Sequence, residues 1–152
     1  MLTGAQIAHF KVEPNWSHGL LFTPRWGEID AYGHVNHGAY LIWCEEVRIA
    51  YFKALGGPAF SPDAPGPVIR DIGFEYMRAI SPADEVLVTG RVAWIRRSSF
   101  RMEYAAWTDG LISRGHATCI WYVNNTKTAV PLPDDLRRKI ITLDGSEERS
   151  TQ

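Results

Sequence analysis

One short segment of the sequence concentrates the side chains that are capable of chemistry. Residues 28–37 read EIDAYGHVNH and place two carboxylates, two histidines and an asparagine directly before a long apolar stretch. A carboxylate can act as a nucleophile or as a general base, and a histidine can exchange a proton near neutral pH. Asp and Asn also suit turns and helix caps, where they accept backbone hydrogen bonds. The segment is therefore either a strongly capped helix start or a reaction site.

The apolar stretch that follows predicts a long helix over residues 39–55. Asn36 suits the N-cap position, and Gly56-Gly57-Pro58 is a stop signal. Most of the helix circumference is apolar, so we expect the rest of the protein to surround the helix almost completely. The charged residues fall within one arc of the helical wheel: Glu45, Glu46, Arg48 and Lys53.

Strand-like segments occupy most of the remaining chain. They are residues 18–26, 68–80, 86–97, 99–108 and 111–123. The Asp109-Gly110 pair between the last two segments is a hairpin signal. In the last segment, Gly115, Ala117 and Cys119 form a face of small residues, which would let a helix approach closely.

One domain with two less regular ends accounts for these segments. We expect an N-terminal arm at residues 1–16, a single domain at residues 17–142 and a disordered tail at residues 143–152. Pro14 argues against regular structure in the arm, and residues 133–141 are expected to form a short helix. The order of elements predicts an α+β hot-dog fold, in which a five-stranded antiparallel sheet wraps around one long central helix.

Composition restricts the class of protein. The chain has 152 residues, 45% of them hydrophobic and 22% charged, with a formal net charge of -1. These values are typical of a soluble domain and give no reason to expect nucleic acid or a membrane surface as a partner. The first residues lack the features of a secretory signal peptide, and both cysteines, Cys44 and Cys119, lie in apolar segments. Free buried thiols in a cytoplasmic protein are therefore expected.

The segment from Arg25 to Arg48 resembles the signature region of acyl-CoA thioesterases of the 4-hydroxybenzoyl-CoA thioesterase type, which have the hot-dog fold. Many of those proteins have asparagine where this chain has His37. A histidine there, seven residues after Asp30, resembles the branch associated with the Tol–Pal envelope system, in which both residues are assigned to catalysis. The residues that match the signature are Glu28, Asp30, Gly33, Tyr40, Glu45 and Arg48.

The resemblance implies an acyl-CoA thioesterase that needs neither a metal nor an organic cofactor. It implies that the backbone N–H of His37 polarises the thioester carbonyl, and that Asp30 either attacks the carbonyl carbon or deprotonates water. The His37 side chain would protonate the leaving thiolate or orient the water, although a solvated ring without a role fits equally well. Turn capping by Asp30 and an ion pair between Glu45 and Arg48 are the structural alternatives, and Glu28 is expected to be a loop carboxylate.

The same resemblance implies a substrate-binding set that is spread along the chain. The segment WIRRSSF, residues 94–100, is similar to the segment that binds the CoA phosphates in the 4-hydroxybenzoyl-CoA enzyme, with Ser98 in the place of a lysine. Arg96 and Arg97 match its two arginines. Adjacent strand residues point to opposite faces, so at most one of the two lies in a given groove. The expected substrate-binding residues are Gly38, Tyr40, Glu45, Arg96, Arg97 and Ser99.

Other functions fit parts of the sequence. Asp30, His34 and His37 have side chains that bind zinc or iron, but a fourth ligand is not evident, so no metal is expected. A hot-dog enoyl-CoA hydratase has its histidine five residues after the aspartate, whereas the spacings here are four and seven. An acyl-carrier-protein thioesterase and a non-catalytic acyl-CoA sensor are further rivals. The acyl group stays open, and the expected state is a homodimer or homotetramer because such a sheet has open edges.

Overall fold

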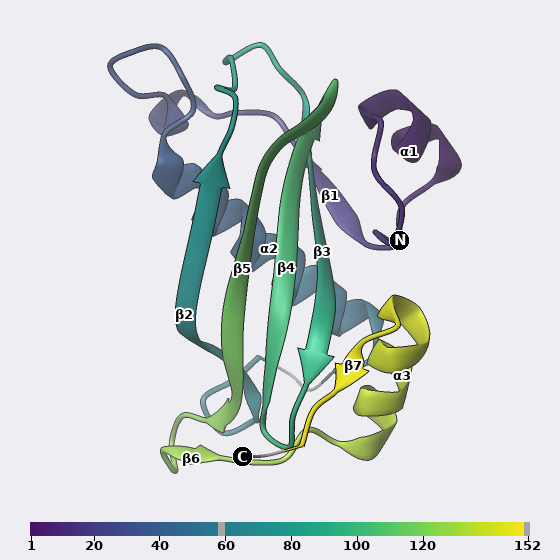
Figure 1. The fold of residues 1–152 in the computed structure, drawn as a ribbon. Coiled ribbons are helices and arrows are strands. Elements are labelled where there is room, and N and C mark those ends of the chain that lie inside the picture. Colours follow the sequence, from purple (N-terminus) through teal and green to yellow (C-terminus); the bar gives the residue numbers. More distant parts are fainter. Residues whose placement is uncertain (58–59, 151–152) are drawn as a thin grey trace.

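One long helix lies across one face of an antiparallel sheet (Figure 1). The computed structural model describes residues 1–57 and 60–150. The main strands follow the order β1-β3-β4-β5-β2, which confirms the α+β hot-dog architecture and the five-stranded sheet. They are β1 (Gly19–Phe22), β2 (Gly66–Tyr76), β3 (Val86–Ile95), β4 (Ser99–Thr108) and β5 (Gly110–Val123). Two short strands extend the sheet: β6 (Thr128–Ala129) beside β5, and β7 (Glu147–Glu148) beside β3.

The bounds of the elements differ from the prediction mainly near residue 30. The strand predicted at residues 18–26 stops at Phe22, and a 3₁₀ turn, η1 (Trp26–Glu28), leads into the loop before the long helix. Helix α3 (Asp134–Asp144) extends the short helix that was predicted at residues 133–141. In the described part of the chain, no helix is long and apolar enough to cross a membrane.

The long helix, α2 (His37–Ala54), begins two residues before the predicted start. Asn36 is its N-cap, because the side chain accepts a hydrogen bond from the Gly38 amide at 2.7 Å. At the other end, Gly56 has a φ of +72°, and the Gly57 amide bonds back to the Phe52 carbonyl at 2.8 Å. The cap and the glycine stop are therefore confirmed, whereas Pro58 lies outside the described residues.

Helix α2 is covered on one side only, which corrects the expectation of a nearly surrounded helix. Val47 is fully buried, but the side chains of Leu41 and Ile42 are 37% and 53% exposed. Glu45 lies on this exposed face as well. Arg48, expected in the same polar arc, is instead buried and donates a hydrogen bond to the Tyr104 hydroxyl at 3.2 Å. The sheet of one chain curls around only part of the helix, so an apolar strip remains in contact with solvent.

A glycine on β3 allows the helix to pack closely against the sheet. A Cβ atom on Gly90 would lie 2.8 Å from a methyl group of Val47. The sequence had suggested the small residues of β5 for this role. There, a Cβ atom on Gly115 would instead meet the ring of Phe74 on β2 at 2.6 Å. The close approach of the helix to the sheet therefore depends on Gly90.

The two cysteines, Cys44 and Cys119, are both free and buried, as the sequence predicted.

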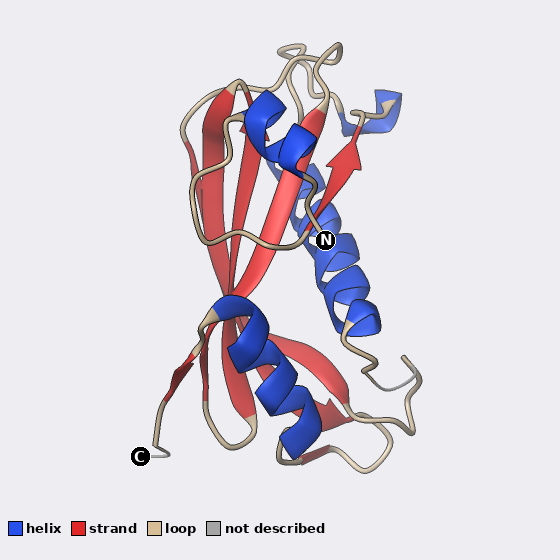
Figure 2. Cartoon of the chain, turned by 90° about the vertical axis from the view of Figure 1, so that its right-hand side faces the viewer, coloured by secondary structure: helices blue, strands red, loops and turns tan. Residues whose placement is uncertain are grey.

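The N-terminal arm contains a helix, which corrects the expectation of an arm without regular structure. Helix α1 (Gly4–Phe10) begins with a capping box in which Thr3 and Gln6 bond reciprocally. Phe10 is buried in a second apolar cluster that includes Leu87 and Trp107. Figure 1 shows the N-terminal segment beside the edge of the sheet at which β1 and β3 lie, and Figure 2 views the molecule from that edge. Pro14 does not prevent this helix, because the helix already ends at Phe10 with Lys11 as its C-cap.

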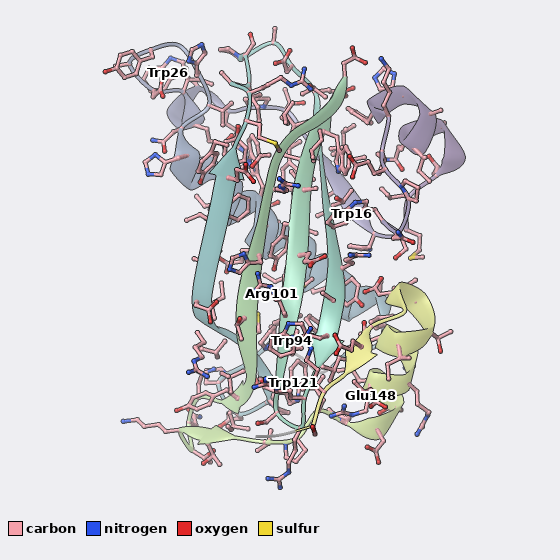
Figure 3. The ribbon with its side chains drawn as sticks, viewed as in Figure 1. Trp16, Trp26, Trp94, Arg101, Trp121 and Glu148 are labelled. Atoms are coloured by element: carbon pink, nitrogen blue, oxygen red, sulfur yellow. The ribbon has the colours of Figure 1, made fainter. Side chains whose placement is uncertain are left out.

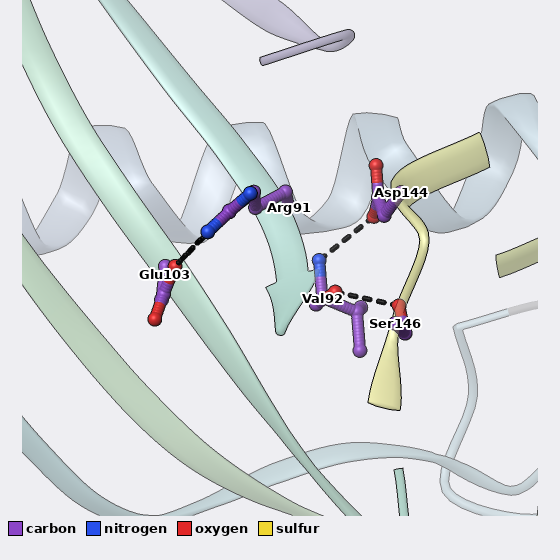
Figure 4. A network of polar contacts seen from close by, with 5 residues as sticks. All are labelled: Arg91, Val92, Glu103, Asp144 and Ser146. Atoms are coloured by element: carbon purple, nitrogen blue, oxygen red, sulfur yellow. Dashed lines mark hydrogen bonds and ion pairs between the residues drawn. The ribbon is translucent and has the colours of Figure 1, made fainter. Parts of the chain in front are cut away.

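The C-terminal segment is ordered as far as it is described, which corrects the expectation of a disordered tail at residues 143–152. The Asp144 carboxylate accepts a hydrogen bond from the Val92 amide at 2.8 Å, and the Ser146 hydroxyl donates to the Val92 carbonyl at 2.6 Å (Figure 4). Strand β7 then pairs in parallel with β3. A polar composition predicts disorder, but here the polar groups bind the backbone of β3. Residues 151–152 lie outside the described residues.

Candidate active site

The loop before α2 holds Asp30 by one oxygen of its carboxylate. Asp30 Oδ1 accepts hydrogen bonds from the amides of Tyr32 at 2.9 Å and His34 at 3.1 Å. Gly33 closes the turn with a φ of +78°, a conformation that favours glycine. Within residues 1–57 and 60–150, no hydrogen bond involves Oδ2. Asp30 is therefore a turn cap, and the capping bonds orient the carboxylate while one oxygen stays available.

The loop is attached to the helix through Glu28. Its carboxylate accepts a hydrogen bond from the Trp43 indole at 3.1 Å and another from the Arg25 amide at 2.8 Å. Its carbonyl accepts a hydrogen bond from the Asn36 amide at 2.7 Å. Both carboxylate oxygens of Glu28, the last residue of η1, have structural partners, which agrees with the expectation of a structural carboxylate.

Asp30 opens onto a cleft of about 320 Å³, named here the Asp30 cleft. Among the predicted site residues, the cleft brings together Asp30, His37 and Tyr40. It also includes His34, which is exposed. The lining residues are Asp30, His34, Val35, His37, Tyr40, Tyr76, Met77, Arg78 and Ala79.

The first turn of α2 presents one unpaired backbone donor. The Gly38 amide is bound by the Asn36 side chain, and the Ala39 amide donates to the Asn36 carbonyl at 3.0 Å. The His37 amide has no acceptor within the part of the chain that the structure describes. An unpaired N–H at a helix N-terminus can bind an oxyanion. Gly38, predicted to bind substrate, lies next to this donor, but its own N–H is already occupied.

Tyr76 links the end of β2 to this helix start, and sequence reasoning missed it. Its hydroxyl donates a hydrogen bond to the His37 carbonyl at 3.2 Å, and its ring lies edge-on to Tyr40 with 5.0 Å between centroids. The contact joins residues far apart in the sequence, so no local pattern reveals it. The alternation of apolar residues in β2 indicated only that Tyr76 would be in a strand.

The two tyrosines of the cleft stay protonated near neutral pH. Burial, reinforced by the neighbouring Tyr76, raises the pKa of Tyr40 to about 12. Burial and the nearby Cys44 thiol raise the pKa of Tyr76. Both hydroxyls are therefore neutral groups that can donate a hydrogen bond. Among the residues that line the cleft, Asp30 is the only carboxylate.

The remaining predicted residues do not reach the Asp30 cleft of the same chain. Glu45 lies on the exposed face of α2, and no ion pair with Arg48 is present within the described residues. Arg96, Arg97 and Ser99 lie at the β3–β4 turn, at the end of the sheet opposite the loop that carries Asp30 (Figure 1). Arg96 is half-buried and Arg97 is exposed.

A metal site of protein ligands is not evident near this cleft. Across the described ranges, no group of three or more His, Cys, Asp or Glu side chains is placed so as to hold a metal ion. Asp30, His34 and His37 line one cleft without forming such a group.

The match to known proteins follows the fold and covers this cleft. A family model described as the thioesterase-like superfamily matches residues 24–140. The chain belongs to this superfamily. The matched part includes the Asp30 cleft, helix α2 and all the main strands except β1.

Solved structures and a curated relative agree with membership of the thioesterase-like superfamily. The crystal structure of a thioesterase superfamily protein from Jannaschia sp. CCS1 is 31% identical, with a TM-score of 0.87 and coverage of 97% of this chain and 96% of that one. A thioesterase from Thermus thermophilus, solved with coenzyme A and Zn, is 28% identical with a TM-score of 0.74, covering 88% and 98%. The uncharacterised Bacillus subtilis protein YsmA is 30% identical over 80 residues, and this match spans about half of each chain, 53% of this one and 54% of YsmA.

Proposed function

We propose that this protein is an acyl-CoA thioesterase that hydrolyses its substrate in the Asp30 cleft. The observation that carries the proposal is the presence, in one cleft, of a carboxylate with an available oxygen and an unpaired N–H at the start of α2. Thioester hydrolysis needs both groups, because a nucleophile or base must act while a donor stabilises the developing oxyanion. The solved relative with bound coenzyme A supports CoA as the carrier of the acyl group.

In this mechanism the thioester oxygen accepts a hydrogen bond from the His37 amide. Asp30 either attacks the carbonyl carbon or removes a proton from the water that attacks it. The tetrahedral intermediate then expels the CoA thiolate, which takes up a proton. Where water has attacked, the acid is released directly; where Asp30 has attacked, water next hydrolyses the mixed anhydride between the acyl group and Asp30. The products of both routes are a free acid and CoA. The exposed His37 side chain lines the cleft, as does that of His34, and we assign the proton transfer to the thiolate to His37. Solvent oxygen-18 that enters the Asp30 carboxylate during turnover would identify direct attack, followed by hydrolysis of the anhydride at the carboxyl carbon of Asp30.

The proposed enzyme works as a homodimer or as a homotetramer. Strand β2 is an edge strand, and its apolar residues Val68, Ile69 and Ile72 are exposed. Antiparallel pairing of two β2 strands would bring the end of one strand, at Tyr76, beside the beginning of the other. The Asp30 cleft of one copy would then approach the β3–β4 turn of its partner, which carries Arg96 and Arg97. A monomer by light scattering at micromolar concentration would contradict this part of the proposal.

Release of free thiol from a panel of acyl-CoAs tests the function directly. The panel spans short, long and aromatic acyl groups, because the acyl group is not assigned. Release of CoA with any of them supports the proposal. An enoyl-CoA that loses its conjugated absorbance without release of thiol would indicate a hydratase instead. Tight binding of acyl-CoA without turnover of any member would indicate a sensor.

A further inference from the structure

Three arginines gather around one indole at the β3–β4 end of the sheet. The guanidinium carbons of Arg96 and Arg149 lie 5.3 Å and 5.2 Å from the ring centroid of Trp94. Arg101 is the cross-strand partner of Trp94 on β4. Figure 3 shows Arg101 and Trp94 one above the other on the sheet. Trp94, Arg96, Arg101 and Arg149 are named here the arginine cluster, and Arg97 follows Arg96 in the adjoining turn.

Backbone hydrogen bonds fix Arg149 beside the turn. In the parallel ladder between β7 and β3, Glu147 lies opposite Trp94 and Glu148 lies opposite Ile95. The Arg149 amide extends this pairing by donating to the Ile95 carbonyl at 2.8 Å. The fold therefore holds Arg149 against Trp94, the indole that Arg96 also contacts, although the two arginines are far apart in the sequence.

Carboxylates do not balance the charge of the arginine cluster. Arg149 is paired with Glu147 at 2.7 Å, and Arg137 of α3 is paired with Glu148 at 3.1 Å. Arg96 Nε is buried without a hydrogen-bond partner in the described residues. Like charges held close together repel, so an anion bound among them would stabilise the arrangement. Within residues 1–57 and 60–150, Arg96 and Arg101 of the cluster have no carboxylate partner.

We propose that Arg149 of the C-terminal segment joins Arg96 in binding the phosphates of the nucleotide part of a CoA thioester. The inference rests on the proposed function and deepens it, because it assigns CoA rather than an acyl carrier protein as the acyl carrier. A guanidinium offers a planar set of donors that matches phosphate oxygens. The phosphopantetheine arm of a carrier protein lacks the adenosine nucleotide and its 3′-phosphate, so it would leave this cluster unfilled.

The test compares Arg149→Gln with the wild type on three substrates that share one acyl group. The substrates are the acyl-CoA, the acyl-3′-dephospho-CoA and the N-acetylcysteamine thioester. KM for the acyl-CoA should rise roughly fivefold, as expected for the loss of one charge-assisted contact in a solvent-accessible site, with kcat kept. The N-acetylcysteamine thioester should not respond to the substitution. A smaller rise with the dephospho-substrate assigns the contact to the 3′-phosphate, and an equal rise assigns it to the diphosphate.

Two further variants separate phosphate binding from a structural role of the tail. Arg138→Gln is the matched control, because Arg138 is an exposed arginine of α3 outside the cluster, and its KM should stay at the wild-type value. Glu147→Gln frees Arg149 from its ion pair and should lower KM for the acyl-CoA. If Glu147→Gln raises KM as much as Arg149→Gln does, the ion pair merely holds β7 in place and the inference is wrong.

Binding of CoA itself provides a readout that does not depend on turnover. Titration calorimetry should give a weaker affinity for CoA in Arg149→Gln than in the wild type, at unchanged melting temperature. Equal affinity for CoA in the two proteins would overturn the role of Arg149 even if the enzyme is active. Loss of thiol release in the wild type with every substrate would instead overturn the proposed function, whatever the titration shows.

Discussion

The Asp30 cleft and the arginine cluster lie at opposite ends of the sheet and are built in different ways. The cleft depends mainly on contacts that are local in the sequence, since Asp30 binds the amides of Tyr32 and His34. The cluster depends on a distant contact, because Arg149 reaches Trp94 only through the pairing of β7 with β3. The groups proposed to react are thus held by short-range geometry, whereas the groups proposed to bind the nucleotide are held by the tertiary fold.

The two regions also differ in charge. The described residues that line the cleft include one carboxylate and one guanidinium, those of Asp30 and Arg78, beside two histidines and two tyrosines. Burial keeps the Tyr40 hydroxyl protonated with a pKa of about 12. The cluster has an excess of guanidinium groups over carboxylates. A single oriented carboxylate suits a chemical step, and a surplus of positive charge suits attraction of a polyanion. Substitutions in the cleft should therefore change kcat, and substitutions in the cluster should change KM.

The largest effect is expected for Asp30→Asn. The asparagine oxygen can still accept the two backbone hydrogen bonds that fix the turn, so the loop should keep its conformation. The substitution removes the charge that attack or base catalysis needs. We expect kcat to fall at least ~100-fold with little change in affinity for the substrate, which is the range for a lost acid–base group.

A second aspartate serves as the control for Asp30. Asp84 also caps a turn, since its carboxylate accepts a hydrogen bond from the Ser81 amide at 2.8 Å, but it does not line the Asp30 cleft. Asp84→Asn should leave kcat unchanged. Near-normal turnover in a folded Asp30→Asn protein would show that Asp30 is a turn cap only.

The sequence predicted the cleft better than it predicted its surroundings. The caps formed by Asn36 and Asp30 involve neighbours within a few residues, and such contacts leave a recognisable pattern of residue types. Tyr76 was missed because its bond to the His37 carbonyl crosses from β2 to α2. The order of the tail was missed because the hydroxyl of Ser146 binds a strand that lies far away in the sequence.

The exposed strip of α2 was missed for a physical reason as well. The apolar circumference of the helix predicts burial, but it does not say which chain provides the cover. Leu41 and Ile42 remain exposed in a single chain.

The role of Gly90 was missed as well. Gly90 lets Val47 approach the sheet, but it is an isolated glycine in an apolar strand, and the sequence pattern alone does not indicate which surface comes close to it.

The next largest effect is expected when Arg96 and Arg97 are both changed to glutamine. KM for the acyl-CoA should rise about tenfold while kcat is largely kept, because a phosphate contact remote from the reacting bond stabilises ground state and transition state alike. The short N-acetylcysteamine thioester, which lacks the nucleotide, should be hydrolysed as by the wild type. An equal loss of rate with both substrates would mean that the arginines are structural, and the contrast between the two ends would then fail.

The smallest effect is expected for Tyr76→Phe, which tests whether positioning alone matters in the Asp30 cleft. The phenylalanine keeps the ring packing on Tyr40 but removes the hydroxyl that binds the His37 carbonyl at 3.2 Å. A looser first turn should lower kcat about threefold, as expected for one neutral hydrogen bond, with KM unchanged. Tyr122→Phe on β5 is the control, because Tyr122 does not line the cleft, and it should behave as the wild type.

Since burial raises the pKa of Tyr76 above its ordinary value of 10.0, the hydroxyl stays a donor throughout the neutral range. The pH profile of kcat should therefore keep its shape in Tyr76→Phe, and a new or lost limb below pH 9 would mean that Tyr76 transfers a proton instead of positioning the helix.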